Sequence, residues 1–157
     1  MTDTRPNQGL GIKAPLGAAI CGLMLLHAAV ADVSWLPAYT ERVQSQGAIA
    51  ALPPHLSMVL GLGDGTQDLA VRQAATRSGQ EVHTFNVAQA QKKPVVVLMN
   101  YNENTKVAQA FLLKSGGHLE KAVTYSAGAA PQPVPESQAK NALRAELQFW
   151  AGEAGAK

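Results

Sequence analysis

The chain has 157 residues, of which 46% are hydrophobic and 15% are charged, as is typical of a single globular domain. Its formal net charge is only +2, and about +1 without the first 31 residues, which excludes the basic footprint of a nucleic-acid-binding or anionic-membrane-binding protein. The single cysteine, Cys21, lies in those first residues, so the remainder has no disulfide, thiol nucleophile or cysteine metal site.

Residues 1–31 predict a secretory signal peptide. Arg5 and Lys13 precede an apolar run from Ala14 to Val30, and the sequence Ala-Val-Ala before Asp32 matches an A-x-A cleavage site. An uncleaved membrane anchor is the alternative, but the run is only about 17 residues long and contains proline and glycine. We therefore expect export to the periplasm or the extracellular space, with no stable membrane insertion after processing.

The rest of the chain predicts one small α+β domain over residues 32–152, followed by a frayed tail at 153–157. Its first element is a helix from about Trp35 to Gln46. Ser34 is expected to cap the start of this helix, and Gly47 supplies the residue after its end.

The next segments show short patterns of two kinds. Leu56 to Leu62 alternates with a period of two, which predicts a strand. Residues 67–78 could alternate as a strand too, but their good helix formers and Gly79 at the end favour a helix. Glu81 to Val87 alternates again and predicts a strand, and a connector over 88–94 follows it.

Val95 to Met99 is a run of five apolar residues and predicts the central strand of the sheet. A β-hairpin follows between Val107 and Tyr125, because Gly116 and Gly117 suit a two-residue turn with φ > 0 at both positions. That turn predicts these pairs: Ser115 with His118, Leu113 with Glu120, Leu112 with Lys121, Phe111 with Ala122, Ala110 with Val123, Gln109 with Thr124, and Ala108 with Tyr125.

The hairpin face that carries Ala110 is expected to lie in the core. The face that carries Phe111 is expected to lie on a partly solvent-exposed surface. A Pro/Ala-rich stretch over 126–135 is expected to be extended. Glu136 to Ala151 predicts a final helix with one apolar stripe, ended by Gly152. The fold class is therefore α+β, with a mixed or mainly antiparallel sheet of about five strands and N- and C-terminal helices packed on it.

The sequence Gly61-Leu62-Gly63-Asp64-Gly65 follows a predicted strand and precedes a segment that favours a helix, as in a dinucleotide-binding βαβ unit. Its spacing is G-x-G-x-G rather than G-x-G-x-x-G, and Asn86 stands where a ribose-binding acid is expected. A simple glycine-rich turn is therefore favoured. Asp64 and Asp68 are interpreted as helix-capping carboxylates rather than as a catalytic pair.

Three histidines follow the signal segment, namely His55, His83 and His118, and none has a second ligand at metal-binding spacing. We expect His55 and His118 to be exposed, and His83 to be half-buried and hydrogen-bonded. The G-x-S-x-G motif of serine hydrolases is absent from the sequence. We therefore assign no catalytic, cofactor-binding or metal-binding residue, and we expect no cofactor.

These observations favour an exported, non-catalytic interaction or structural module with a protein partner and no affinity for nucleic acid. One alternative is a protein that holds a small apolar ligand between the sheet and the terminal helices. The aromatic residues of those helices, whose spacing is also typical of a core, are Trp35, Tyr39, Phe149 and Trp150. A second alternative is a hydrolase that uses His83 or His118 with a nearby acid.

Overall fold

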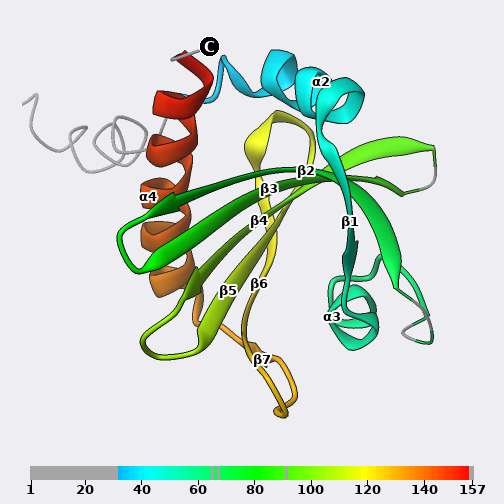
Figure 1. The fold of residues 1–157 in the computed structure, drawn as a ribbon, viewed down its shortest axis with the longest axis vertical. Helices are drawn as coiled ribbons and strands as arrows, with labels where there is room; N and C mark the ends of the chain where they lie inside the picture. The colour runs from blue at the N-terminus through cyan, green and yellow to red at the C-terminus, as the bar shows by residue number, and fades with distance from the viewer. Residues whose placement is uncertain (1–31, 65, 67, 91, 156–157) are drawn as a thin grey trace, which may run out of the picture. The chain divides into compact units, whose positions relative to one another are not determined.

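The computed structural model describes residues 32–155 apart from 65, 67 and 91, and from Val33 onward they form one compact unit (Figure 1). The predicted signal peptide, 1–31, lies outside the described residues. In chain order the elements are α2 (Leu36–Gln46), β1 (Ala48–Leu52), α3 (Pro54–Val59), β2 (Leu69–Ser78), β3 (Glu81–Ala90), β4 (Lys93–Asn102), β5 (Val107–Leu113), the 3₁₀ turn η1 (Ser115–Gly117), β6 (Leu119–Ser126), β7 (Gln132–Pro133) and α4 (Glu136–Gly155). None of the described helices is both long enough and apolar enough to cross a membrane.

The strands form one seven-stranded antiparallel sheet in which each strand pairs with its neighbours in sequence, from β1 to β7. The α+β class and an antiparallel sheet are confirmed, but about five strands was too few. The additional strands are β1, β2 and the two-residue β7, while no strand forms over the predicted segment 56–62. β4 is central, as its apolar run predicted, and Val97 and Leu98 on its two faces are completely buried.

Residues 56–62 form the helix α3 and a following turn, so the predicted strand is wrong. α3 begins after Pro53, with Pro54 in its first turn, where a missing backbone N–H costs no hydrogen bond. Leu56 and Leu60 stand one helical turn apart and are both buried. These leucines satisfy a period of two and a spacing of four equally well, and so short an apolar run does not distinguish strand from helix.

The helix predicted over 67–78 is also wrong, because this segment forms β2. β2 lies inside the sheet, where it pairs with β1 on one side and with β3 on the other. Helix propensities differ by less than about 1 kcal/mol per residue, so two hydrogen-bonded neighbours outweigh them. Gly79 accordingly lies in the turn between β2 and β3, and both β3 and β4 extend into the predicted connector.

The hairpin of β5 and β6 is confirmed, and so is most of its register. The five pairs from Leu112–Lys121 to Ala108–Tyr125 are those predicted. The predicted contrast between a core face and a wetted face is wrong, because Phe111 is only 1% exposed. Its strand register aligns Phe111 with Leu98 and Phe85, on the face of the sheet that the long helices cover.

The turn of this hairpin differs from the predicted two-residue type. The backbone N–H of Lys114 donates to the carbonyl of His118 across η1. Both glycines of η1 have positive φ angles, 83° and 85°, as predicted. Because the turn is longer, the register shifts at its base and Leu113 pairs with Leu119 rather than with Glu120.

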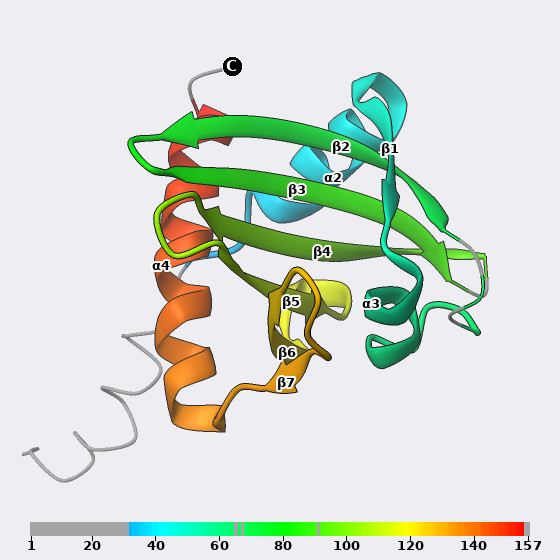
Figure 2. The same cartoon turned by 60° about the horizontal axis from the view of Figure 1, so that its bottom comes forward.

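Helices α2 and α4 pack on the same face of the sheet (Figures 1 and 2), and this confirms the predicted placement of the terminal helices. The ring of Phe85 on β3 lies 4.9 Å from the ring of Tyr39 in α2 and 5.6 Å from that of Trp150 in α4. The helix rings also lie 6.0 Å from each other. One aromatic cluster therefore fixes both helices to the sheet.

The ends of these helices differ from the predicted caps. Trp35, rather than Ser34, is the N-cap of α2, and it makes no side-chain capping hydrogen bond. Gly47 is extended rather than left-handed, and glycine is needed there because a Cβ atom would lie 2.6 Å from the carbonyl oxygen of Val43. α4 continues through Gly152 into the predicted tail, because one glycine costs a helix only about 1 kcal/mol.

The opposite face of the sheet packs against α3. Leu56 and Leu60 of α3 join a second buried cluster with residues from strands β1 to β6. These residues are Leu52, Val71, Ala88, Val97, Ala110, Leu112 and Val123. The sheet therefore has a hydrophobic core on each side, and its inner strands are apolar on both faces.

Candidate functional site

A buried pair of His83 and Glu146 joins β3 to α4. Nδ1 of His83 lies 2.7 Å from Oε2 of Glu146, and the two side chains are only 6% and 4% exposed. Nδ2 of Asn100 donates a hydrogen bond of 3.3 Å to the other oxygen of Glu146. Glu81 places a second carboxylate oxygen 3.3 Å from Nε2 of His83. A carboxylate therefore faces each nitrogen of the imidazole ring.

The environment of this pair disfavours a charged carboxylate. Burial raises the pKa of Glu146 above its ordinary value, because the ionised form loses its hydration. The side chains of His83, Asn100 and Trp150 act in the opposite direction without cancelling this effect. Nε1 of Trp150 is buried and makes no hydrogen bond of normal geometry to the described residues. Phe149 stacks on the imidazole at a centroid distance of 3.9 Å and covers it.

This arrangement is suited to holding α4 on the sheet rather than to catalysis. The pair has the short His–acid distance that the hydrolase alternative requires. A general base must also come within about 3 Å of a substrate proton. Here both side chains are buried, a carboxylate occupies each ring nitrogen, and an aromatic ring covers the imidazole face.

The other histidines lie where the sequence predicted. His55 and His118 are exposed, and the ring of His55 lies 5.1 Å from that of Tyr125. His83 is hydrogen-bonded as predicted, although it is more deeply buried than expected. Across residues 32–155, with their three gaps, no three His, Cys, Asp or Glu side chains are grouped to hold a metal ion.

Glu146 is the member of this buried pair that the sequence did not single out. The final helix buries five residues at spacings of three and four, and four of them are apolar: Ala139, Leu143, Leu147 and Trp150. Glu146 is the fifth. A carboxylate inside an apolar stripe indicates a buried polar partner, and this signal was present in the sequence.

The described residues of the glycine motif, Gly61 to Asp64, form a turn after α3 and not the first turn of a βαβ unit. The strands on either side of it belong to an antiparallel sheet, and Gly65 lies outside the described residues. Asp64 accepts hydrogen bonds from the backbone and hydroxyl of Thr66 at 3.0 and 2.8 Å, so it stabilises this turn rather than capping a helix. Asp68 is exposed and directly precedes β2. Asn86 is fully buried and donates to the carbonyl of Val97, which leaves no ribose site there.

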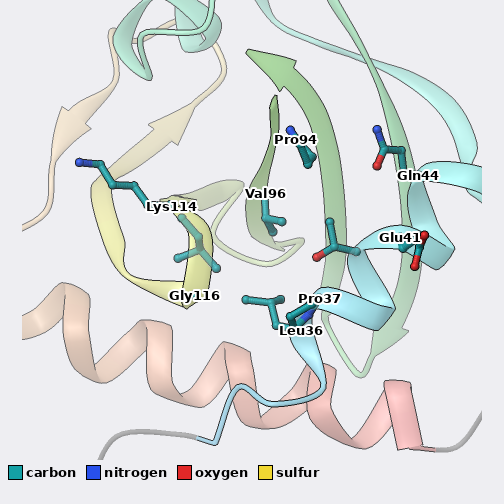
Figure 3. A pocket seen from close by; sticks show the side chains of 10 residues that line it. Leu36, Pro37, Glu41, Gln44, Pro94, Val96, Lys114 and Gly116 are labelled. Atoms are coloured by element: carbon teal, nitrogen blue, oxygen red, sulfur yellow. The ribbon is translucent and has the colours of Figure 1, made fainter. Parts of the chain in front are cut away.

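A groove of about 380 Å³ lies between α2, the start of β4 and the turn after β5 (Figure 3). Its apolar lining comes from Leu36, Pro37, Pro94, Val96 and Leu113. Its polar lining comes from Thr40, Glu41 and Gln44 of α2 and from Lys114 on the opposite side. The groove is therefore a hollow of mixed lining, with apolar side chains from α2, β4 and β5 and polar side chains along its margin.

The aromatic residues of the terminal helices belong to the core instead. Tyr39 and Trp150 are 4% and 1% exposed and pack on Phe85. Trp35 packs edge-on against Tyr39, and Phe149 covers His83. This agrees with the core interpretation of their helical spacing.

Two features of the domain thus have a defined geometry, the buried His83–Glu146 pair and the groove beside α2. No protein-family model, curated protein or solved structure matches this chain.

Proposed function

We propose that the protein is an exported, non-catalytic interaction module that binds a small apolar ligand in the groove beside α2. The observation that carries this proposal is the size and lining of the groove. Its volume of about 380 Å³ falls within the range of roughly 300–1,000 Å³ typical of small-molecule sites. Such sites combine an apolar surface with a few polar groups that orient the ligand, and this groove has both.

The charges at the margin of the groove favour a neutral ligand. Glu41 on α2 contributes a negative charge, whereas the ammonium of Lys114 lies 3.7 Å from Oε2 of Glu120 and is paired there. An anionic ligand would be repelled by Glu41, and a cationic ligand would find only this one carboxylate in the lining. We therefore expect an uncharged apolar molecule with a hydrogen-bonding group that can reach Thr40 or Gln44.

A hydrolase is the weaker candidate. His83 meets the distance requirement but is covered, and His118 is an exposed residue at the hairpin turn. The groove has no histidine in its lining. A binding role therefore agrees better with the geometry than a reaction that needs a general base in contact with its substrate.

Export is the part of the proposal that rests on the sequence alone. If the signal segment is removed as proposed, the protein recovered from its host is expected to begin at Asp32 and to accumulate outside the cytoplasm. Intact-mass measurement of the purified protein, combined with cell fractionation, tests this directly. A protein that retains Met1 and remains in the cytosol would contradict export, without affecting the ligand-binding proposal.

Filling the groove is expected to abolish ligand binding. Thr40 lines the groove from α2, so the variant T40W should place an indole in the hollow. We expect at least a tenfold weaker affinity for Nile red, a neutral apolar dye, because a ligand and an indole cannot share a space of this size. The titration is followed by the dye's fluorescence.

The matched control is A38W, which adds the same indole at an exposed position of the same helix that does not line the groove. Its dye affinity should equal that of the unmodified protein. Equal affinities for T40W, A38W and the unmodified protein, with all three folded by circular dichroism, would rule out this groove as the binding site.

A further inference from the structure

The two edges of the sheet differ in how they are protected. The edge strand β7 is only two residues long, contains Pro133 and is flanked by Pro131 and Pro135, so it cannot extend a hydrogen-bonded ladder. The other edge, β1, has the uncharged sequence Ala-Ile-Ala-Ala-Leu and no proline. Within the described part of the chain it pairs with β2 alone. Ile49, near its middle, is 70% exposed, the highest value among the large apolar residues that are exposed.

We propose that β1 pairs with the β1 strand of a second copy of this chain, antiparallel and centred on Ala50. This inference goes beyond ligand binding, because it concerns a different surface. Edge strands normally avoid pairing through charge, proline or a covering element. β1 has no charge that would oppose an identical strand. A two-fold axis makes such an interface self-complementary, so the same five residues serve both copies.

Shape on one face of β1 supports pairing with an identical strand. In the proposed register, Ile49 of each copy lies directly opposite Ala51 of the other. Both side chains lie on the same face of the sheet, because alternate residues of a strand share a face. Ala51 pairs with Ala70 of β2, and both alanines are exposed. Small side chains, Ala51 and behind it Ala70, thus lie beside the position where the second copy would place its isoleucine.

The neighbouring helices leave this edge accessible. α2 precedes β1 and packs on the face of Phe85, whereas α3 follows β1 and packs on the opposite face. The two-fold axis of this pairing is perpendicular to the sheet. It places the α3 helix of one copy near the α2 helix of the other, and these two helices lie on opposite faces of the extended sheet. The proposed pairing therefore extends the sheet from one copy to the other without a helix between them.

The test is the oligomeric state of the protein purified as its host processes it, measured by sedimentation velocity over a hundredfold range of concentration. We expect a reversible dimer, weakened about tenfold or more by I49E, because two carboxylates would then lie diagonally across the paired strands. The substitution should preserve the monomer, since Ile49 is exposed and its partner on β2 is Arg72. Mixing I49E with I49K should restore association between the two variants.

M58E is the matched control, because Met58 is 52% exposed and lies in α3 rather than on the edge strand. It should dimerise like the unmodified protein. A51E probes the same register at a second exposed position and replaces I49E as the test if that chain does not fold. A chain that stays monomeric throughout the range, or a dimer that persists in both I49E and A51E, would overturn the proposal.

Discussion

Replacement of His83 by alanine is expected to lower the free energy of unfolding by about 3–5 kcal/mol at neutral pH. The substitution removes the imidazole that lies 2.7 Å from Oε2 of Glu146 and leaves the buried carboxylate with only the hydrogen bond from Asn100. Breaking one side of a buried pair costs more than the pair itself contributes, because the remaining group has lost its hydration. Urea denaturation followed by tryptophan fluorescence gives the free energy of unfolding.

The pH dependence of this loss tests its electrostatic origin. The pKa of Glu146 is raised in the folded protein, so the contribution of this group to stability is present in full below its ordinary pKa of 4.5 and is lost as the pH rises through the folded value. Without His83 the folded pKa rises further, because His83 lowers it. The destabilisation by H83A should therefore be larger at about pH 7 than at about pH 4.

Two variants control this prediction. H118A removes an exposed histidine and should change the free energy of unfolding by less than about 0.5 kcal/mol. E146Q, added to H83A, should recover part of the loss at neutral pH because a neutral amide replaces an uncompensated charge. A loss that is equal at both pH values and unaffected by E146Q would show that the site contributes packing alone.

Truncation of Trp150 to alanine is expected to cost about 3–5 kcal/mol, the usual range for a fully buried aromatic side chain. Trp150 is 1% exposed and contacts rings from α2, β3 and its own helix α4. Its removal leaves a cavity where both terminal helices meet the sheet. The same urea titration measures the loss, and near-ultraviolet circular dichroism reports the packing of the aromatic cluster.

W35A is the matched control, because Trp35 belongs to the same cluster but is only half-buried. Since the stabilisation from an apolar side chain scales with the area removed from water, this variant should lose less than W150A. An equal loss in both variants would contradict the assignment of Trp150 as the central contact.

The elements that the sequence predicted correctly are those stabilised by nearby residues. The β5–β6 register follows from a turn with two glycines and from the alternation of its arms, all within about twenty residues. Helices α2 and α4 follow from apolar stripes at helical spacing. β4 follows from five successive apolar residues that include three consecutive valines, a composition that favours a strand covered on both faces.

The elements that the sequence misplaced depend on distant partners. Segment 56–62 carries leucines at a spacing that suits both a strand and a helix, and Leu56 and Leu60 are buried because α3 covers one face of the sheet. Segment 67–78 has the composition of a helix, yet it is a strand because β1 and β3 lie on either side of it.

The sequence by itself determined the α+β class, the central strand and the terminal helices. Only the tertiary structure decided which side chains meet. His83 and Glu146 are 63 residues apart, and the groove combines residues of α2, β4, β5 and the turn after it. Local patterns specify the type of an element through its own repeat. The contacts between elements depend on how the helices pack against the two faces of the sheet. A local sequence repeat does not specify these long-range contacts.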